Sequence, residues 1–170
     1  MVKNMCLLGG FPMTLIYYVL FAAAVVAADQ FTKYLTLVNI PLHSDVSFIP
    51  GFLGFTYVRN YGAAFSSFQN QQWLFVVIFA LFTLLLIWES RKNSMGFNKF
   101  ERWCIAAVYA GGLGNMIDRI RYGYVVDMIE TLFMDFPVFN VADCFITCGC
   151  FALMGSLIFI NKEFWKDEKK

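Results

Sequence analysis

The chain has 170 residues, of which 59% are apolar, 19% aromatic and 15% charged, and its mean hydropathy is +0.61. A soluble domain carries about 25% charged residues, so this composition excludes an ordinary soluble protein and predicts an integral membrane protein. The formal net charge of +1 argues against a basic nucleic-acid-binding surface. The length accommodates about four membrane spans with short loops, so we expect one integral membrane domain over residues 1–170.

The first apolar segment covers residues 11–28, and no charge falls between Lys3 and Asp29. It is long enough to span a bilayer. A secretory signal peptide is the alternative, because the segment ends in small residues typical of a cleavage site. We favour the span because the sequence after Asp29 remains compatible with a helix. Asp29 and Lys33 are spaced i, i+4 and are expected to form a salt bridge at the membrane interface.

The connection over residues 30–72 is too long to be a simple linker. Residues 48–59 are rich in aromatic and β-branched side chains and predict one or two short strands. Residues 122–129 are also strand-like, so we expect a small sheet on the outer membrane surface. A turn leading into a short helix is predicted at residues 60–65, where Asn60 either forms the turn or binds an extended substrate backbone.

Three further apolar segments, at residues 73–88, 103–117 and 143–160, complete the predicted bundle. Tryptophans at both ends of residues 73–88 fit an interfacial belt. Residues 103–117 are too few to cross the hydrocarbon core fully, so Asp118 and Arg119 are expected at or just inside one membrane face. The glycines of this segment are expected to allow close helix packing; they are Gly111, Gly112 and Gly114.

The distribution of Lys and Arg orients the predicted bundle. Nine of the 13 Lys and Arg residues fall in the two terminal tails and the connection between the second and third segments. By the positive-inside rule, both termini are then cytoplasmic. Four carboxylates converge on the opposite, extracytoplasmic face: Asp29, Asp118, Asp127 and Asp143.

Asp127 and Asp143 are candidates for a catalytic pair, which we call the dyad. Two close carboxylates cannot both ionise cheaply, so one keeps a proton near neutral pH. The carboxylate then activates water while the acid polarises a scissile carbonyl. The simpler alternatives are that Asp143 caps a helix with Asn140 as its N-cap residue, and that Asp127 is a solvated loop carboxylate.

Asn115, Asp118 and Arg119 lie at i, i+3 and i+4 and share one helix face. Arg119 either pairs with Asp118 as a structural anchor or binds a substrate carbonyl or lipid phosphate. The only histidine is His43, which argues against Ser–His or Cys–His catalysis. The cysteines near residue 150 lack zinc-site spacing and are interpreted as buried small apolar residues; they are Cys144, Cys148 and Cys150.

Together these motifs resemble the lipoprotein signal peptidases, the bacterial signal peptidase II family. The match covers nearly the whole chain in family order, through residues 29–33, 59–65, 114–119 and 139–143. The resemblance implies an aspartyl endopeptidase of the bacterial inner membrane with its site on the extracytoplasmic side. It would cleave diacylglyceryl-modified prolipoproteins just before the lipidated cysteine, without a metal or organic cofactor. The cyclic peptide globomycin would inhibit it.

The resemblance also assigns roles by position. Asp127 and Asp143 match the catalytic dyad. The positions that orient the dyad or the substrate are matched by Asn60, Asn115, Arg119 and Asn140. Supporting polar or packing positions are matched by Asp29, Lys33, Gly111 and Asp118. The apolar segment 133–137 is expected to enter the membrane surface near the lipid of the substrate.

Two alternatives are considered beside this interpretation. A presenilin-type aspartyl protease carries Tyr-Asp and Gly-x-Gly-Asp motifs in more numerous spans, whereas Asp127 follows Val126 here. A small proton-coupled carrier would also use membrane carboxylates. It would place them near the bilayer midplane, whereas the span lengths place them at the outer face.

Overall fold

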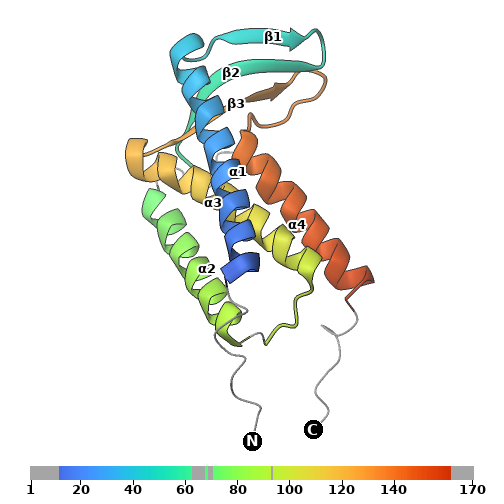
Figure 1. Cartoon of the computed structure of the whole chain (residues 1–170). Helices are drawn as coiled ribbons and strands as arrows, with labels where there is room; N and C mark the ends of the chain where they lie inside the picture. Colours follow the sequence, from blue (N-terminus) through green and yellow to red (C-terminus); the bar gives the residue numbers. More distant parts are fainter. Residues whose placement is uncertain (1–11, 63–67, 69–70, 93, 162–170) are drawn as a thin grey trace, which may run out of the picture.

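The computed structural model describes residues 12–62, 68, 71–92 and 94–161, which form a helical bundle capped at one end by a small sheet (Figure 1). The helices are α1 (Pro12–Asn39), α2 (Gln72–Lys92), α3 (Lys99–Tyr122) and α4 (Val141–Phe159). The strands are β1 (Asp45–Ile49), β2 (Leu53–Asn60) and β3 (Val125–Thr131). The helices correspond to the four predicted segments. Strands β2 and β3 correspond to the two predicted strand regions, while β1 lies mostly before residue 48, where the first region was expected to begin.

Three helices in the described part of the chain are long and apolar enough to cross a membrane, at Leu15–Asn39, Gln72–Lys92 and Val141–Phe159. The fourth, α3, is more polar and packs against α1, α2 and α4. The helix continues beyond the apolar segment 11–28 without a break to Asn39, as the helix-compatible sequence after Asp29 predicted. Two polar residues of this part of α1, Gln30 and Lys33, bond to side chains of α3, and its threonines and Asn39 donate to backbone carbonyls of α1 itself.

The sheet is antiparallel with strand order β1-β2-β3, which confirms a sheet built from both predicted regions. Its third strand begins later than predicted, because α3 extends through Tyr122. Gly123 then ends the helix in the left-handed conformation, with φ 76°, and donates its N–H to the carbonyl of Arg119. The short helix predicted at residues 60–65 falls largely outside the described residues.

The sheet rests on the extended end of α1, as the view in Figure 1 shows. Tyr57, Val126 and Met128 form a buried apolar cluster beneath the strands, and Leu37 and Ile40 pack against it from the helix end. The part of α1 beyond Asp29 rises about 15 Å at 1.5 Å per residue. It therefore acts as a support that fixes the height of the sheet above the bundle.

Glycines set the close spacing of the helices. A Cβ on Gly111 would collide with the backbone carbonyl oxygen of Ala142, and one on Gly114 would lie 2.6 Å from Asp29 Oδ2. On Gly149 of α4, a Cβ would lie 2.8 Å from Val108 of α3. These contacts confirm the predicted packing role of the α3 glycines, because larger residues would separate the helices that carry the polar motifs.

A second polar cluster ties α3 to α4 at the end of the bundle remote from the sheet. Asn98 caps α3 in a capping box with Glu101, whose side chain is fully buried. Ser156 Oγ donates to Glu101 Oε1 at 2.8 Å, and Asn161 Nδ2 donates to Oε2 at 2.8 Å. The two helices are thus held together at this end by hydrogen bonds and nearer the sheet by glycine contacts.

Replacing Gly111 by alanine should destabilise the protein. The added methyl group meets a backbone carbonyl that cannot rotate away, and overpacking of this kind costs about 1–3 kcal/mol. Gly155→Ala on α4 is the matched control, because no atom of the described residues lies within 4 Å of the place that its methyl group would take. Thermal unfolding in detergent should show a lower transition temperature for Gly111→Ala and an equal or higher one for Gly155→Ala. Equal stability of Gly111→Ala and the parent would contradict the packing argument.

Candidate active site

The start of α4 is fixed by a capping box that includes one candidate catalytic residue. Asn140 Oδ1 accepts the backbone N–H of Asp143 at 2.9 Å, and Asp143 Oδ2 accepts the N–H of Asn140 at 3.1 Å. The predicted capping role of these two residues is therefore confirmed. Phe139 pairs with Ile129 in an antiparallel bridge, so the residues leading into α4 lie beside β3.

The other candidate carboxylate lies on β3. Asp127 pairs across the sheet with Val58, and Asn60 pairs with Val125, so Asn60 and Asp127 are diagonal neighbours on adjacent strands. Asn60 Nδ2 donates to Asp127 Oδ2 at 2.9 Å, while Asn60 Oδ1 accepts the N–H of Gly62 at 2.9 Å. Asn60 thus forms the predicted turn and also orients Asp127, which is buried and not a solvated loop carboxylate.

Two asparagines join the carboxylates. Asn140 Nδ2 donates to Asp127 Oδ1 at 2.6 Å and to Asn115 Oδ1 at 3.1 Å. Asn115 Nδ2 in turn donates to Asp143 Oδ1 at 2.8 Å. Every oxygen of the two carboxylates therefore accepts a hydrogen bond from a fixed donor, which holds both groups in one orientation.

A buried ion cluster lies behind this pair, and we call it the outer polar network: Asp29, Gln30, Lys33, Asn115 and Asp118. Lys33 Nζ lies 2.9 Å from Asp29 Oδ2, 3.0 Å from Asp118 Oδ2 and 2.9 Å from Asn115 Oδ1. The predicted Asp29–Lys33 pair is confirmed, and Asp118 takes the same lysine as its partner instead of Arg119.

The network also fixes backbone on two other elements. Asp29 Oδ1 accepts the N–H of Ala142 at 3.0 Å, and Asp118 Oδ2 accepts the N–H of Val126 at 3.0 Å. These two backbone groups immediately precede Asp143 and Asp127 in sequence. The four predicted carboxylates do converge, and two of them position the backbone that carries the other two.

Burial gives the carboxylates unequal surroundings. Asp127 is 2% exposed, and loss of hydration raises its pKa from 3.8 to about 7. The charge of Asp143 is the second cause of this rise, and hydrogen bonds from Asn60 and Asn140 oppose it. The Asp127 carboxyl group can therefore hold a proton near neutral pH beside a second carboxylate.

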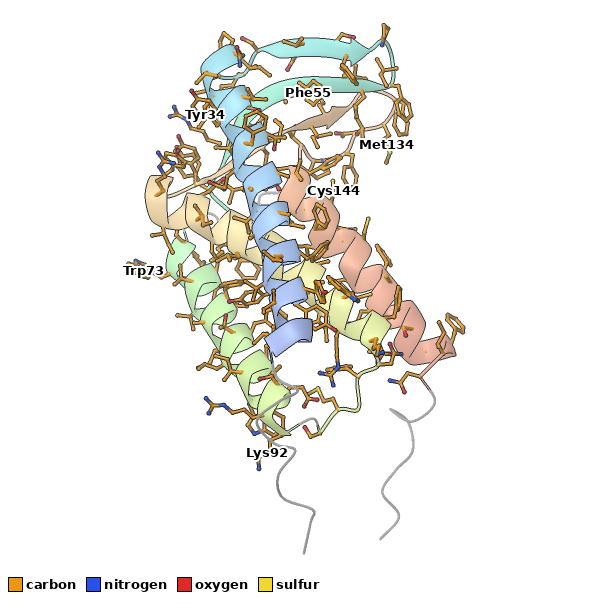
Figure 2. All side chains as sticks on the ribbon, in the orientation of Figure 1. Tyr34, Phe55, Trp73, Lys92, Met134 and Cys144 are labelled. Carbon is orange, nitrogen blue, oxygen red and sulfur yellow. The ribbon has the colours of Figure 1, made fainter. Side chains whose placement is uncertain are left out.

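Both carboxylates line one large cavity of about 1230 Å³, which we call the dyad cavity. It lies between β2, residues 135–139 and helices α2, α3 and α4. Among the residues of its wall are Asn60, Phe75, Phe79, Phe82, Asn115, Arg119, Asp127, Asp143, Cys144 and Cys148. Figure 2 shows Cys144 on the part of α4 nearest the sheet, with Met134 on the loop beside it.

Arg119 enters this cavity from α3. One guanidinium nitrogen donates to the carbonyl of Gly62 at 2.9 Å, and the group lies 4.4 Å from the ring centroid of Phe75. Its buried Nε has no hydrogen-bond partner among the described residues. The guanidinium is therefore held in place while its Nε–H donor is not used by any described residue.

The cysteines are less uniformly buried than the sequence suggested. Cys104 is buried and Cys144 and Cys150 are half-buried, but Cys148 is exposed. The prediction is wrong for Cys148 because its face of α4 borders the dyad cavity and not another helix. In the described part of the chain, no three His, Cys, Asp or Glu side chains are grouped so as to hold a metal ion.

Sequence reasoning missed some residues at this site. Gln30 Nε2 donates to Asp118 Oδ1 at 2.9 Å and to the carbonyl of Gly114 at 3.2 Å. Its position next to Asp29 was the available signal. The α2 phenylalanines in the cavity wall could not be distinguished from lipid-facing ones, because α2 is apolar on every side.

Proteins of similar sequence and structure identify the family of this chain. Residues 21–159 match the family model of signal peptidase (SPase) II. A lipoprotein signal peptidase of Enterococcus faecalis is 42% identical over 151 residues, covering 87% of this chain and 91% of that protein. One of Lactococcus lactis is 41% identical over 141 residues, covering 81% and 90%.

A solved bacterial membrane enzyme has the same fold, with a TM-score of 0.79 and 34% identity over 91% of this chain and 93% of its own. The buried carboxylates, the capping box and the network behind them thus belong to a chain that matches curated peptidases over most of its length. The chain belongs to the signal peptidase II family, the lipoprotein signal peptidases of bacterial membranes.

Proposed function

We propose that this protein is an aspartyl endopeptidase that removes the signal peptide from diacylglyceryl-modified prolipoproteins, just before the lipidated cysteine. The observation that carries the proposal is the coupling of Asp127 and Asp143 through Asn140 on the wall of one cavity. Family membership supports cleavage of prolipoprotein signal peptides, and the two coupled carboxylates supply a chemistry for it.

The two carboxylates take different parts in the mechanism. Asp127, whose pKa is raised to about 7, is the acid that donates a hydrogen bond to the scissile carbonyl. Asp143 lies in the first turn of α4, its Oδ2 accepts the backbone N–H of Asn140, and it is the general base. Asp143 takes a proton from water as the water attacks the scissile carbonyl. When the carbon–nitrogen bond breaks, a protonated carboxyl group of the dyad gives a proton to the leaving amine.

Residues in the wall of the dyad cavity and behind it orient the dyad or the substrate. Arg119 offers its unused Nε donor to a substrate carbonyl, and Asn60, Asn115 and Asn140 hold the two carboxyl groups. Asp29, Lys33, Gly111 and Asp118 support them. No metal or organic cofactor takes part. The phenylalanine-lined side of the dyad cavity suits the acyl chains of the substrate, and a globomycin-type cyclic peptide would compete for the same space.

The membrane setting is part of the proposal. All four helices, including the more polar α3, cross the bacterial cytoplasmic membrane as one domain, with both termini in the cytoplasm and the sheet on the extracytoplasmic side. Asp143 is the third residue of α4, so the dyad lies near a helix end. This position suits a peptidase at the membrane surface better than a carrier with carboxylates at the midplane. The exposed residues Phe133, Met134 and Phe136 would contact the membrane surface.

Removal of either carboxylate should abolish cleavage without unfolding the protein. Asp127→Asn and Asp143→Asn keep the side-chain shape, and loss of a catalytic group of this kind lowers kcat by about 1000-fold or more. The measurement is cleavage of a synthetic lipobox peptide, with and without the diacylglyceryl group, by detergent-purified protein. The parent should cut only the lipidated peptide, before its cysteine. Cleavage at the parental rate by either well-folded variant would rule out the dyad.

The neighbouring thiol should be dispensable. Cys144 follows Asp143 and lines the dyad cavity, but the proposed chemistry uses no thiol. Cys144→Ala should therefore retain most of the cleavage activity in the same assay. Loss of activity with normal expression and normal thermal stability would instead assign the thiol a direct role.

The raised pKa of Asp127 should make stability depend on pH. The folded protein binds this proton more tightly than the unfolded chain, so the stabilisation is complete below about pH 4 and is lost as the pH rises through about 7. The transition temperature of Asp127→Asn in detergent should therefore rise relative to that of the parent as the pH is raised from about 4 to about 7. Asp45→Asn, which removes an exposed carboxylate on β1, is the control and should follow the parent. A constant difference between Asp127→Asn and the parent across this range would contradict the assignment.

A further inference from the structure

The face of α4 beside the dyad carries two thiols. Cys144 and Cys148 are one helical turn apart and both line the dyad cavity. Cys148 is exposed and Cys144 is half-buried. Cys148 lies beyond Asp143 by a rise of about 7.5 Å along the helix, so its sulfur is close to the catalytic end of the dyad cavity without belonging to the dyad.

The other described cysteines provide an internal comparison. Cys104 is buried in α3, and its backbone carbonyl packs against Gly149 of α4. Cys150 is half-buried and is not part of the cavity wall. These two thiols behave as small packing residues. Packing between helices does not account for an exposed thiol on a cavity wall. Cys148 therefore differs from Cys104 and Cys150 in the exposure of its thiol.

We propose that Cys148 is a covalent modification site at which a small apolar electrophile, such as a maleimide or an acrylamide, closes the dyad cavity to substrate. The inference rests on the proposed function for its effect on activity, but the accessibility of the thiol does not depend on it. Cys144, which is less exposed, is the slower second target.

The reaction needs no partner beyond the electrophile and water. The Cys148 thiolate attacks the alkene carbon β to a carbonyl of the electrophile and forms one carbon–sulfur bond. The alkene π electrons pass to the adjacent carbonyl as an enolate, which takes a proton from water, while the thiol proton goes to solvent. Only the thiolate is nucleophilic, and Cys148 is exposed, so the electrophile and water can reach its sulfur.

The adduct would inhibit by occupying space and not by disturbing the dyad. Neither Asp127 nor Asp143 takes a hydrogen bond from Cys148; their donors are Asn60, Asn115 and Asn140. A group attached to Cys148 projects between α4 and the phenylalanine-lined wall of α2, where a lipidated peptide would have to lie. Inhibition should therefore follow the extent of Cys148 modification.

The test uses full-length protein in detergent with Cys6→Ser, so that the four remaining thiols are the described ones. N-ethylmaleimide is added for increasing times, and peptide mapping by mass spectrometry locates each adduct. Cys148 should react first, and the activity should fall in proportion to its adduct. Cys148→Ser should keep its own untreated activity through the same exposure, while the matched Cys150→Ser should lose activity as the parent does.

A second readout separates this inference from the proposed function. In the Asp143→Asn variant, which cannot cleave, a bound lipidated peptide should slow Cys148 modification and leave that of Cys150 unchanged. Modification of Cys104 or Cys150 as fast as Cys148, or full activity with Cys148 fully modified, would overturn the inference. If the cysteines of the parent are modified in the expected order but the parent cleaves no lipopeptide, the proposed function alone would be overturned.

Discussion

The buried ammonium group of Lys33 is the interaction on which the rest of the site depends. It is 2% exposed and lies between the carboxylates of Asp29 and Asp118, with its third hydrogen bond to Asn115. Removing the lysine from such a buried cluster would cost about 3–5 kcal/mol, because the two carboxylates would then have neither water nor a counter-ion. The two carboxylates exceed the one ammonium in charge, so backbone N–H groups complete their solvation.

Those backbone groups explain how charge buried in the bundle orders the dyad. Asp29 and Asp118 each need a further donor, and they take the N–H groups of Ala142 and Val126. The first fixes the start of α4 and the second fixes β3 relative to α3. Because the next residue in each case is a member of the dyad, the same hydrogen bonds that stabilise the buried charges also set the positions of Asp143 and Asp127.

The sequence indicated the polar residues of the site but not all of their partners. Span lengths and the Lys and Arg distribution were enough to predict that four carboxylates converge, since charged residues in an apolar chain have few places to lie. The pairing of Asp118 with Lys33, and not with the adjacent Arg119, depends on how α1 and α3 cross. Tertiary packing also determines the extension of α1 to Asn39 and the exposure of Cys148. In a helix that is apolar on every side, the sequence periodicity does not show which face meets another helix.

The unequal surroundings of the two carboxylates follow from their different secondary structures. Asp143 occupies the first turn of a helix, where backbone dipoles stabilise negative charge. Asp127 lies in a buried strand, where no such dipole compensates for lost hydration, and its pKa rises to about 7. One asparagine, Asn140, thus joins a carboxylate on a strand to a carboxylate at a helix start, and the two side chains have different surroundings. Because Asn60, Asn115 and Asn140 hold both carboxylates through fixed donors, the folded protein sets the geometry of the pair in advance of any reaction.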